Sequence, residues 1–282
     1  MKSQHASLTF RRTICYVVLG LLTVLSLFPF LILIINSTRS HMQIQLGFSL
    51  IPGKEFLNNL RGVLSNKNIP VVRALGNSVY VSAATAVLTT YFSCMTAYGV
   101  YMYNFKGKKF VFNFILLIMM VPAQVSTLGF LKLIAKFHMD NTLVALFIPS
   151  IAAPVIFFYM YQAMEATLPF SIVEAARVDG CNEFRTFNTI ALPMLKPSIA
   201  VQAIFAFVSS WNNYFTPALV ISSKEKKTIP IIIAQLRSAD YSKFNMGHVY
   251  MTICIAIIPL IIVYLFLSRS IIAGVTNGGV KE

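Results

Sequence analysis

Six stretches of about 20 residues without a charged side chain constrain this chain more than any other feature. A helix rises about 1.5 Å per residue, so about 20 apolar residues cross a hydrocarbon core about 30 Å thick. Inside such a core every backbone N–H and C=O must be paired, which a helix does internally. The runs are residues 14–35, 75–98, 110–131, 142–164, 198–221 and 249–268. We therefore predict an all-α membrane protein with six transmembrane helices.

Composition agrees with the membrane class and excludes several others. The chain is 57% hydrophobic and 11% charged, whereas soluble domains have about 25% charged residues. Its net charge is +14, but the basic residues lie in loops and tails without interleaved aromatic residues, which favours lipid headgroups over nucleic acid. The four cysteines show no CxxC spacing, so neither a disulfide framework nor a zinc site is predicted. The first run is too long for a signal peptide, and we expect it to be retained.

The sequence offers the chain no energy source of its own. The six runs contain no Asp, Glu, Lys, Arg or His, and ion-coupled carriers rely on such groups in the membrane. Residues 47–55 resemble a phosphate-binding loop, but five residues separate the glycines and Glu55 replaces the required Ser or Thr. The four histidines are scattered. We therefore predict no catalytic residue, no metal and no bound cofactor, so that a partner supplies the energy or the chain is a channel.

A polar stripe follows one face of the second run. Its members are separated by three or four residues, which places them on one helical face; they are Ser78, Ser82, Thr85, Thr89, Ser93 and Thr96. Small polar residues of this kind allow close helix packing, which we favour, or line a polar passage. Both interpretations stay open on the sequence.

The long polar stretch from Glu165 to Pro197 carries its own helix signals. Ser171 and Glu174 have the spacing of a capping box, so a short helix is predicted to begin at Ile172. Gly180 suits its left-handed C-terminal position. A second helix is predicted from residue 182 to 192, followed by Pro193. A two-turn helix needs a cover for its apolar side, and this cover is either the chain's own helix ends or a partner protein; a catalytic role is disfavoured.

These residues resemble a known family. Residues 174–180 (EAARVDG), then 190–193 (IALP) and Pro197, resemble the EAA loop of binding-protein-dependent ABC importer permeases. Trp211 and Asn212 are similar to the W-N segment of its carbohydrate branch, and residues 274–281 are close to that branch's C-terminal ending. The resemblance covers nearly the whole chain and is strongest to the smaller six-helix permease of the maltose transporter.

The resemblance implies a function, partners and roles for particular residues. It implies a type I permease fold and import of a carbohydrate, in particular an oligosaccharide, with polyamine or glycerol phosphate as alternative cargo. The implied partners are a second permease, two ATPase subunits that bind ATP and Mg²⁺, and an extracellular or periplasmic solute-binding protein. Residues expected to contact the ATPase from loop 165–197 are Glu174, Ala175, Ala176, Asp179, Gly180, Leu192 and Pro193. Residues expected to approach it from the tail are Gly274, Gly278, Gly279 and Lys281.

The orientation of the chain follows from the resemblance, whereas the Ser and Thr passage candidates come from the polar stripe. Lys and Arg are divided almost equally between the two sets of loops, so charge alone does not orient the chain. The resemblance implies a bacterial plasma membrane with a cytoplasmic N-terminus (residues 1–13), coupling loop and tail (269–282), around a permease domain at 14–268. The candidate passage residues are Ser82, Thr85, Thr89, Ser93, Trp211 and Asn212. Residues 222–248 correspond to an external loop that, in the maltose system, enters the binding protein.

Overall fold

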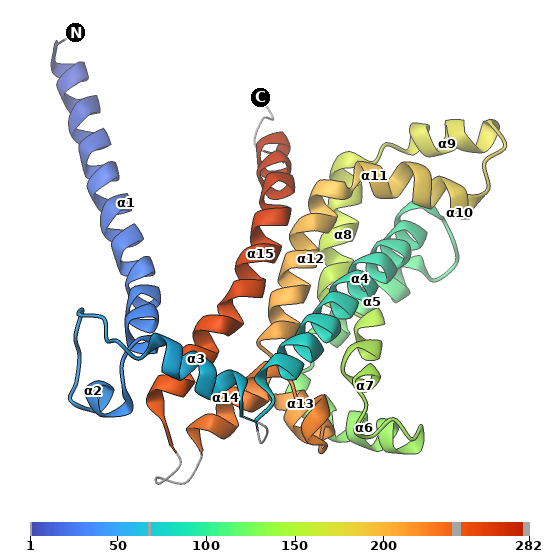
Figure 1. Ribbon diagram of the computed structural model, residues 1–282. Coiled ribbons are helices and arrows are strands. Elements are labelled where there is room, and N and C mark those ends of the chain that lie inside the picture. The colour runs from blue at the N-terminus through green and yellow to red at the C-terminus, as the bar shows by residue number, and fades with distance from the viewer. Residues whose placement is uncertain (1, 67–68, 239–243, 279–282) are drawn as a thin grey trace. The chain divides into compact units, whose positions relative to one another are not determined.

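The computed structural model describes residues 2–66, 69–238 and 244–278, and every regular element within them is a helix. The contacts divide the chain into two compact units. Unit 1 comprises residues 1–71 and 233–257, and unit 2 comprises residues 72–232 and 258–282. Each unit is described by itself below, with the element labels of Figure 1.

Unit 1 combines a long apolar helix with a short, tightly bonded connection. It holds α1 (Lys2–Ser37), α2 (His41–Gln45), α3 (Phe56–Leu64), the end of α14 (Ile229–Arg237) and the first part of α15 (Met246–Gly278). The amide of the buried Asn59 donates to the carbonyls of Ser37 at 2.9 Å and Arg39 at 3.0 Å. These bonds fasten α3 to the end of α1 because they pair backbone groups that the end of a helix leaves free.

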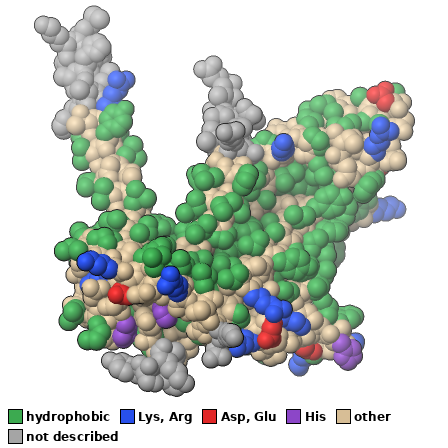
Figure 2. Space-filling model, in the orientation of Figure 1, with side chains coloured by type: hydrophobic (Ala, Val, Ile, Leu, Met, Phe, Trp, Pro, Cys, Tyr) green, Lys and Arg blue, Asp and Glu red, His purple; other side chains and the backbone are tan. Residues whose placement is uncertain are grey.

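Unit 2 contains most of the remaining helices. They are α4 (Val71–Met102), α5 (Lys108–Met119), α6 (Ala123–Lys136), α7 (Val144–Phe147), η1 (Ile148–Ile151), α8 (Pro154–Thr167), α9 (Phe170–Val178), α10 (Glu183–Thr186), η2 (Phe187–Ala191), α11 (Leu192–Met194), α12 (Lys196–Trp211), α13 (Phe215–Val220) and η3 (Lys224–Lys226). Figure 1 shows α9, α10 and α11 beside the C-terminal end of α4, with α6 and α13 toward its other end. On the face drawn in Figure 2, hydrophobic side chains cover the helices between these two ends.

All six predicted runs are helical, but three of them are broken. Within the described residues, four segments are long and apolar enough to cross a membrane, and a fifth if residues 183–194 and 196–211, bent by 83°, are one span. The third run is divided between α5 and α6 next to Pro122, which has no N–H to continue the helix. The fourth is divided between η1 and α8, and the fifth between α12 and α13. The all-α membrane fold is thus confirmed, with interrupted helices inside it.

The break in the fourth run is stabilised by the polar stripe of α4. Pro154 lacks the N–H that would pair with the carbonyl of Ser150 in a continuous helix. The hydroxyl of Thr89 donates to that carbonyl at 3.0 Å, and the hydroxyl of Ser93 donates to the carbonyl of Ala153 at 3.4 Å. Two members of the stripe thus stabilise this break, and Thr89 does so by pairing the carbonyl that Pro154 leaves free.

A single apolar core joins α4 to the segment that follows α8. Its buried members come from the last turns of α4, from α8, and from α9 to α11; they include Cys94, Tyr98, Tyr101, Met160, Met164, Leu168, Val173, Phe187 and Leu195. Tyr101 also stacks on Phe170 at the start of α9, with ring centroids 4.7 Å apart. This end of unit 2 is consequently one packed body.

Candidate functional site

The helix α9 begins earlier than the sequence predicts. It runs from Phe170 to Val178, its N-cap is Pro169, and the cap makes no side-chain hydrogen bond. The predicted capping box of Ser171 and Glu174 is therefore wrong. The stacking of Phe170 on Tyr101 and the extended backbone of Pro169 fix the start instead, which leaves Ser171 inside the first turn.

The end of α9 has the predicted left-handed residue. Gly180 has φ +79°, and the N–H groups of Gly180 and Cys181 each donate at 3.0 Å to the carbonyls of Arg177 and Ala176. This pair of bonds is a Schellman motif, which closes a helix through one left-handed residue. A side chain at position 180 would strain the turn, because L-residues rarely adopt this φ.

Opposite faces of α9 have opposite environments. Val173 belongs to the core of the packed body, and Ala176 is buried as well. Glu174, Ala175, Asp179 and Gly180 are exposed. Four large apolar side chains are exposed as well, namely Phe170 at 47%, Ile172 at 39%, Val178 at 87% and Phe184 of α10 at 69%. The cover offered by the chain's own helices accounts for one face of α9, and the other face is uncovered.

An ion pair fastens α9 to α10 and both to α4. Nε of Arg177 donates to Oε1 of Glu183 at 2.6 Å, and the hydroxyl of Tyr98 on α4 donates to Oε2 at 3.2 Å. The guanidinium also lies 5.4 Å from the ring centroid of Tyr103, a cation–π distance. The hydrogen bond from Arg177 lowers the pKa of Glu183 below its ordinary value. We call these four residues the clamp, since they hold the short helix to the end of α4.

The segment after the clamp is helical throughout but irregular. Asn182 caps α10 by accepting the N–H of Arg185 at 2.8 Å, so the predicted second helix begins where the sequence places it. It continues through a π-helical turn, η2, and ends in α11, where Leu192 is half-buried and Pro193 is exposed. The chain then bends by 83° into α12. π-Turns of this kind are frequent at functional sites.

A large cavity of about 940 Å³ lies among α4, α8 and α12. Two members of the polar stripe, Thr85 and Thr89, line it together with further polar and aromatic side chains; these are Ser150, Tyr159, Gln202, Phe205, Ser209, Ser210 and Asn213. No Asp, Glu, Lys, Arg or His lies among its described lining residues. The hydroxyl of Ser210 donates to Thr85 at 3.3 Å across the cavity wall.

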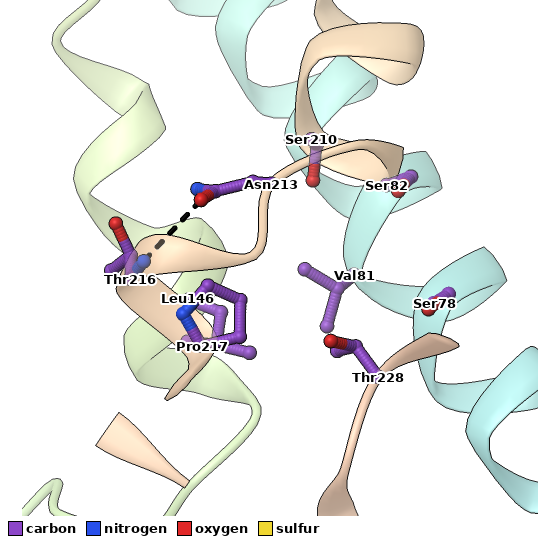
Figure 3. A pocket seen from close by; sticks show the side chains of 9 residues that line it. All are labelled: Ser78, Val81, Ser82, Leu146, Ser210, Asn213, Thr216, Pro217 and Thr228. Atoms are coloured by element: carbon purple, nitrogen blue, oxygen red, sulfur yellow. Dashed lines mark hydrogen bonds between the residues drawn. The ribbon is translucent and has the colours of Figure 1, made fainter. Parts of the chain in front are cut away.

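A second pocket of about 10 Å³ adjoins the cavity and shares Leu146, Ser210 and Asn213 with it. Figure 3 shows its lining from α4, α7, α12, α13, the connection between α12 and α13, and Thr228. Ser82, another member of the stripe, lies here, and its hydroxyl and that of Thr228 are buried without a hydrogen-bond partner among the described residues. The pocket has about the volume that one water or hydroxyl group needs.

The other end of α4 holds the backbone of residues 225–229. The amide of Asn77 donates to the carbonyls of Glu225 and Lys227 at 2.9 Å each, and Oγ of Ser78 accepts the N–H of Ile229 at 2.9 Å. Asn141, which has a positive φ of 55°, accepts the N–H groups of Ser222 and Ser223 through Oδ1. Short polar side chains thus fix this loop from two sides.

The remaining candidate residues lie elsewhere. Trp211 is buried and stacks on Phe207 with centroids 5.7 Å apart, and Asn212 is exposed next to Asn213, the amide that lines the cavity. Gly274 and Gly278 lie on α15. Gly279 and Lys281 lie outside the described residues.

Several residues of the site escaped the sequence analysis. Gln202, Phe205, Ser209 and Asn213 recur at steps of three and four along the fifth run, a helical face that could have been read from the sequence. The clamp offered no comparable signal. Arg177 and Glu183 are six residues apart, a spacing that brings side chains together only through the turn at Gly180.

Comparison with known proteins identifies the family. The model of the family described as binding-protein-dependent transport system inner membrane component matches residues 69–276. The chain belongs to this family. The permease is 35% identical over 264 residues to the arabinooligosaccharides transport system permease protein AraQ of Halalkalibacterium halodurans, covering 91% of this chain and 92% of that protein. It is 31% identical to the lactose transport system permease protein LacG of Rhizobium radiobacter, over 94% and 95% of the two chains.

A solved structure shares the fold of this permease. It is that of a bacterial ABC transporter involved in the import of the acidic polysaccharide alginate, with a TM-score of 0.78 at 21% identity over 91% of this chain and 95% of that one. The type I permease fold is therefore shown. The protein is a multi-pass membrane transport subunit.

Proposed function

We propose that this permease is one of two permease subunits in an ABC importer that moves an uncharged carbohydrate, in particular an oligosaccharide, across a bacterial plasma membrane. A solute-binding protein delivers the substrate, and two ATPase subunits that bind ATP and Mg²⁺ drive alternating access. The permease itself hydrolyses no ATP. Its termini and loop 165–197 face the cytoplasm.

The observation that carries the proposal is the uncovered face of α9. A short helix is unstable alone, yet here one side is packed into the core and closed by the Schellman turn, while Glu174, Val178 and Asp179 stay exposed. Exposed apolar residues rimmed by charges are typical of a protein interface. The ATPase subunit is the partner proposed for this face.

The clamp gives this contact a route into the membrane. A push on α9 reaches α4 through Arg177, Glu183 and Tyr98, and α4 holds residues 225–229 through Asn77 and Ser78 at its other end. Movement of α4 also displaces Thr85 and Thr89, which line the large cavity. The cavity wall and the loop beyond it therefore follow the ATPase.

The chemistry of the cavity supports an uncharged cargo. Hydroxyl and amide groups with nearby aromatic rings suit sugar hydroxyls and the apolar faces of a sugar. Relatives include the sn-glycerol-3-phosphate transport system permease protein UgpE of Brucella abortus, at 31% identity. A phosphate would call for Arg or Lys, and a polyamine for carboxylates, and neither lies among the described lining residues.

Reconstitution tests the proposal against its two rivals. Vesicles containing the full importer, with its binding protein outside and ATP inside, should accumulate a labelled neutral oligosaccharide, and an excess of glycerol phosphate or polyamine should not compete. Vesicles that contain this permease alone should show no flux. Flux through the permease alone would establish a channel or carrier instead, and competition by the charged solutes would reassign the cargo.

A further inference from the structure

The loop of residues 40–53 in unit 1 has an unusual surface. It contains no Asp, Glu, Lys or Arg, and we call it the uncharged loop. Five of its large apolar side chains are exposed, namely Met42 at 72%, Leu46 at 87%, Phe48 at 68%, Leu50 at 53% and Ile51 at 76%. Large apolar side chains exposed together in one short loop indicate a contact with a membrane or with another protein.

The uncharged loop is folded, so its exposed side chains have a fixed arrangement. Ser40 and Gln43 form a complete capping box at the start of α2. His41 accepts the N–H of Met246 through Nδ1 at 3.2 Å, which fastens the loop to the start of α15. The apolar side chains consequently project from a body that is held on its other side.

The charge that precedes the loop, Arg39, is turned inward, and Lys54 and Glu55 follow the loop at its other end. The guanidinium of Arg39 is buried and donates from Nη1 to the carbonyl of Gly47 at 3.2 Å and to Oδ1 of Asn36 at 3.2 Å. Nη2 donates to the carbonyl of Gln43. Arginine thus pairs carbonyls of the loop, and pairing of this kind is what a backbone near hydrocarbon requires.

The apolar surface continues that of a membrane helix. The ring of Phe48 lies 6.0 Å from that of Phe28, centroid to centroid. Phe28 belongs to the first predicted span and precedes Ser37, the last residue of α1, by nine residues, or about 14 Å along the helix axis. Figure 2 shows hydrophobic side chains along α1 and around the loop at its end.

We propose that residues 42–51 insert into the lipid bilayer at the end of α1, with Phe48, Leu50 and Ile51 among the acyl chains and the backbone at the level of the headgroups. An amphipathic segment buries its apolar face about 5–10 Å deep in this zone. Lipid is the occupant that matches a surface without charge and continuous with α1. The outer leaflet is the one concerned, given the proposed orientation; the insertion itself does not depend on that orientation or on any partner.

Tryptophan fluorescence tests the insertion. The chain has one tryptophan, Trp211, so Phe48→Trp in a Trp211→Phe background places a single reporter in the loop. In vesicles of phosphatidylcholine brominated on the acyl chains near the headgroup, its emission should be blue-shifted and lose at least about half its intensity, because the ring lies at acyl depth. Ser65→Trp in the same background, at the exposed end of α3, is the control and should be quenched by aqueous iodide instead.

The fluorescence of the Phe48→Trp reporter is then measured in the assembled importer. The fluorescence of a matched complex that carries Trp211→Phe but retains Phe48 is subtracted from it. Equal quenching by brominated lipid in the assembled state and in the permease alone supports insertion. Quenching by iodide would show that the loop faces water. Quenching by lipid in the permease alone that disappears on assembly would show that another subunit covers the loop. Either of the last two outcomes overturns the proposal and leaves the proposed transport function unaffected.

Discussion

The two ends of α4 are fastened by different chemistry. Near its C-terminal end, buried apolar side chains, stacked rings and the ion pair of Arg177 and Glu183 join it to α9 and α10. Near its N-terminal end, Asn77 and Ser78 hold only backbone groups of residues 225–229. A packed core resists deformation as a whole. At the other end the bond of Ser78 to Ile229 is buried, but the bonds of Asn77 are partly exposed and can be exchanged for water. We infer that the first end moves as a rigid body and that the second adapts.

The largest effect is expected at the uncovered face of α9. Glu174→Lys reverses an exposed charge at the proposed ATPase contact and should lower transport at least about tenfold, which corresponds to about 1.4 kcal/mol of coupling. The fold should be unaffected, because Glu174 makes no described contact with the core. Substrate uptake and ATPase activity of the reconstituted importer measure the effect.

Two further variants separate charge from position. Asp140→Lys makes a similar charge change at an exposed site beyond α6 and should leave transport unchanged. Gly180→Asp places a charged side chain on the left-handed residue and should act in the same direction as Glu174→Lys. Normal uptake by the Glu174→Lys importer, with the ATPase subunits still bound, would remove α9 from the coupling route.

Disruption of the clamp should lower transport less than Glu174→Lys does. Arg177→Glu sets two carboxylates against each other where a 2.6 Å ion pair now lies, and we expect about a threefold to tenfold loss of transport with little loss of ATPase binding. The pair is partly exposed, so the stability change should be about 1 kcal/mol or less. Thermal unfolding and substrate uptake, measured on the same preparation, distinguish a loss of stability from a loss of transport.

Charge exchange provides the control for the clamp. Arg177→Glu combined with Glu183→Arg restores opposite charges and should recover much of the transport. Recovery should be incomplete, because an arginine at position 183 cannot accept the hydrogen bond from Tyr98. If the double variant is no better than the single one, the ion pair does not transmit movement.

A smaller effect is expected at the adaptable end. Asn77→Ala removes two hydrogen bonds of 2.9 Å to residues 225–227, each worth about 0.5–1.5 kcal/mol and less where water reaches them. Hydrogen exchange of the amides between 222 and 229 should rise by about tenfold for each 1.4 kcal/mol lost, while transport falls about twofold or less. Asn104→Ala, at an exposed amide outside the candidate residues, is the matched control. Unchanged exchange would show that Asn77 does not hold the loop.

The features that the sequence predicts depend on local interactions, and the features that it does not predict depend on tertiary contacts. The six runs and the left-handed Gly180 follow from local rules, since hydropathy and one φ angle decide them. The positions of the prolines do not by themselves predict where the helices break. Pro29 and Pro259 lie inside continuous helices, whereas Pro122 and Pro154 stand at breaks. The difference depends on neighbours such as Thr89, which pairs the carbonyl freed by Pro154.

Tertiary contacts also explain why the sequence analysis failed at two points of loop 165–197. The capping box of Ser171 and Glu174 has correct spacing, but the stacking of Phe170 on Tyr101 starts α9 before it can form. The contact between Tyr98 and Glu183 joins residues 85 positions apart, which no local pattern encodes. The polar face of Gln202, Ser209 and Asn213 was readable, since its spacing is as regular as that of the stripe on α4.

The smallest expected effect is the pH dependence of the clamp. The hydrogen bond from Arg177 lowers the pKa of Glu183, so the clamp stabilises the protein above the ordinary glutamate pKa of about 4.3. This contribution is lost as the pH falls through the lower pKa of the folded state, where the carboxylate takes up a proton. Its size is about 1 kcal/mol or less, because the two side chains are 35% and 42% exposed.

Glu183→Gln isolates the contribution of the ionised carboxylate to stability, because glutamine retains the shape of the side chain but not its charge. The difference in unfolding free energy between the parent permease and Glu183→Gln should be constant from about pH 5 to 8 and should shrink below about pH 4. Glu165→Gln, at an exposed glutamate on α8, controls for general acid effects. A difference that grows on acidification would mean that Glu183 is destabilising when charged, and the packed body would then owe its rigidity to its apolar core rather than to the ion pair.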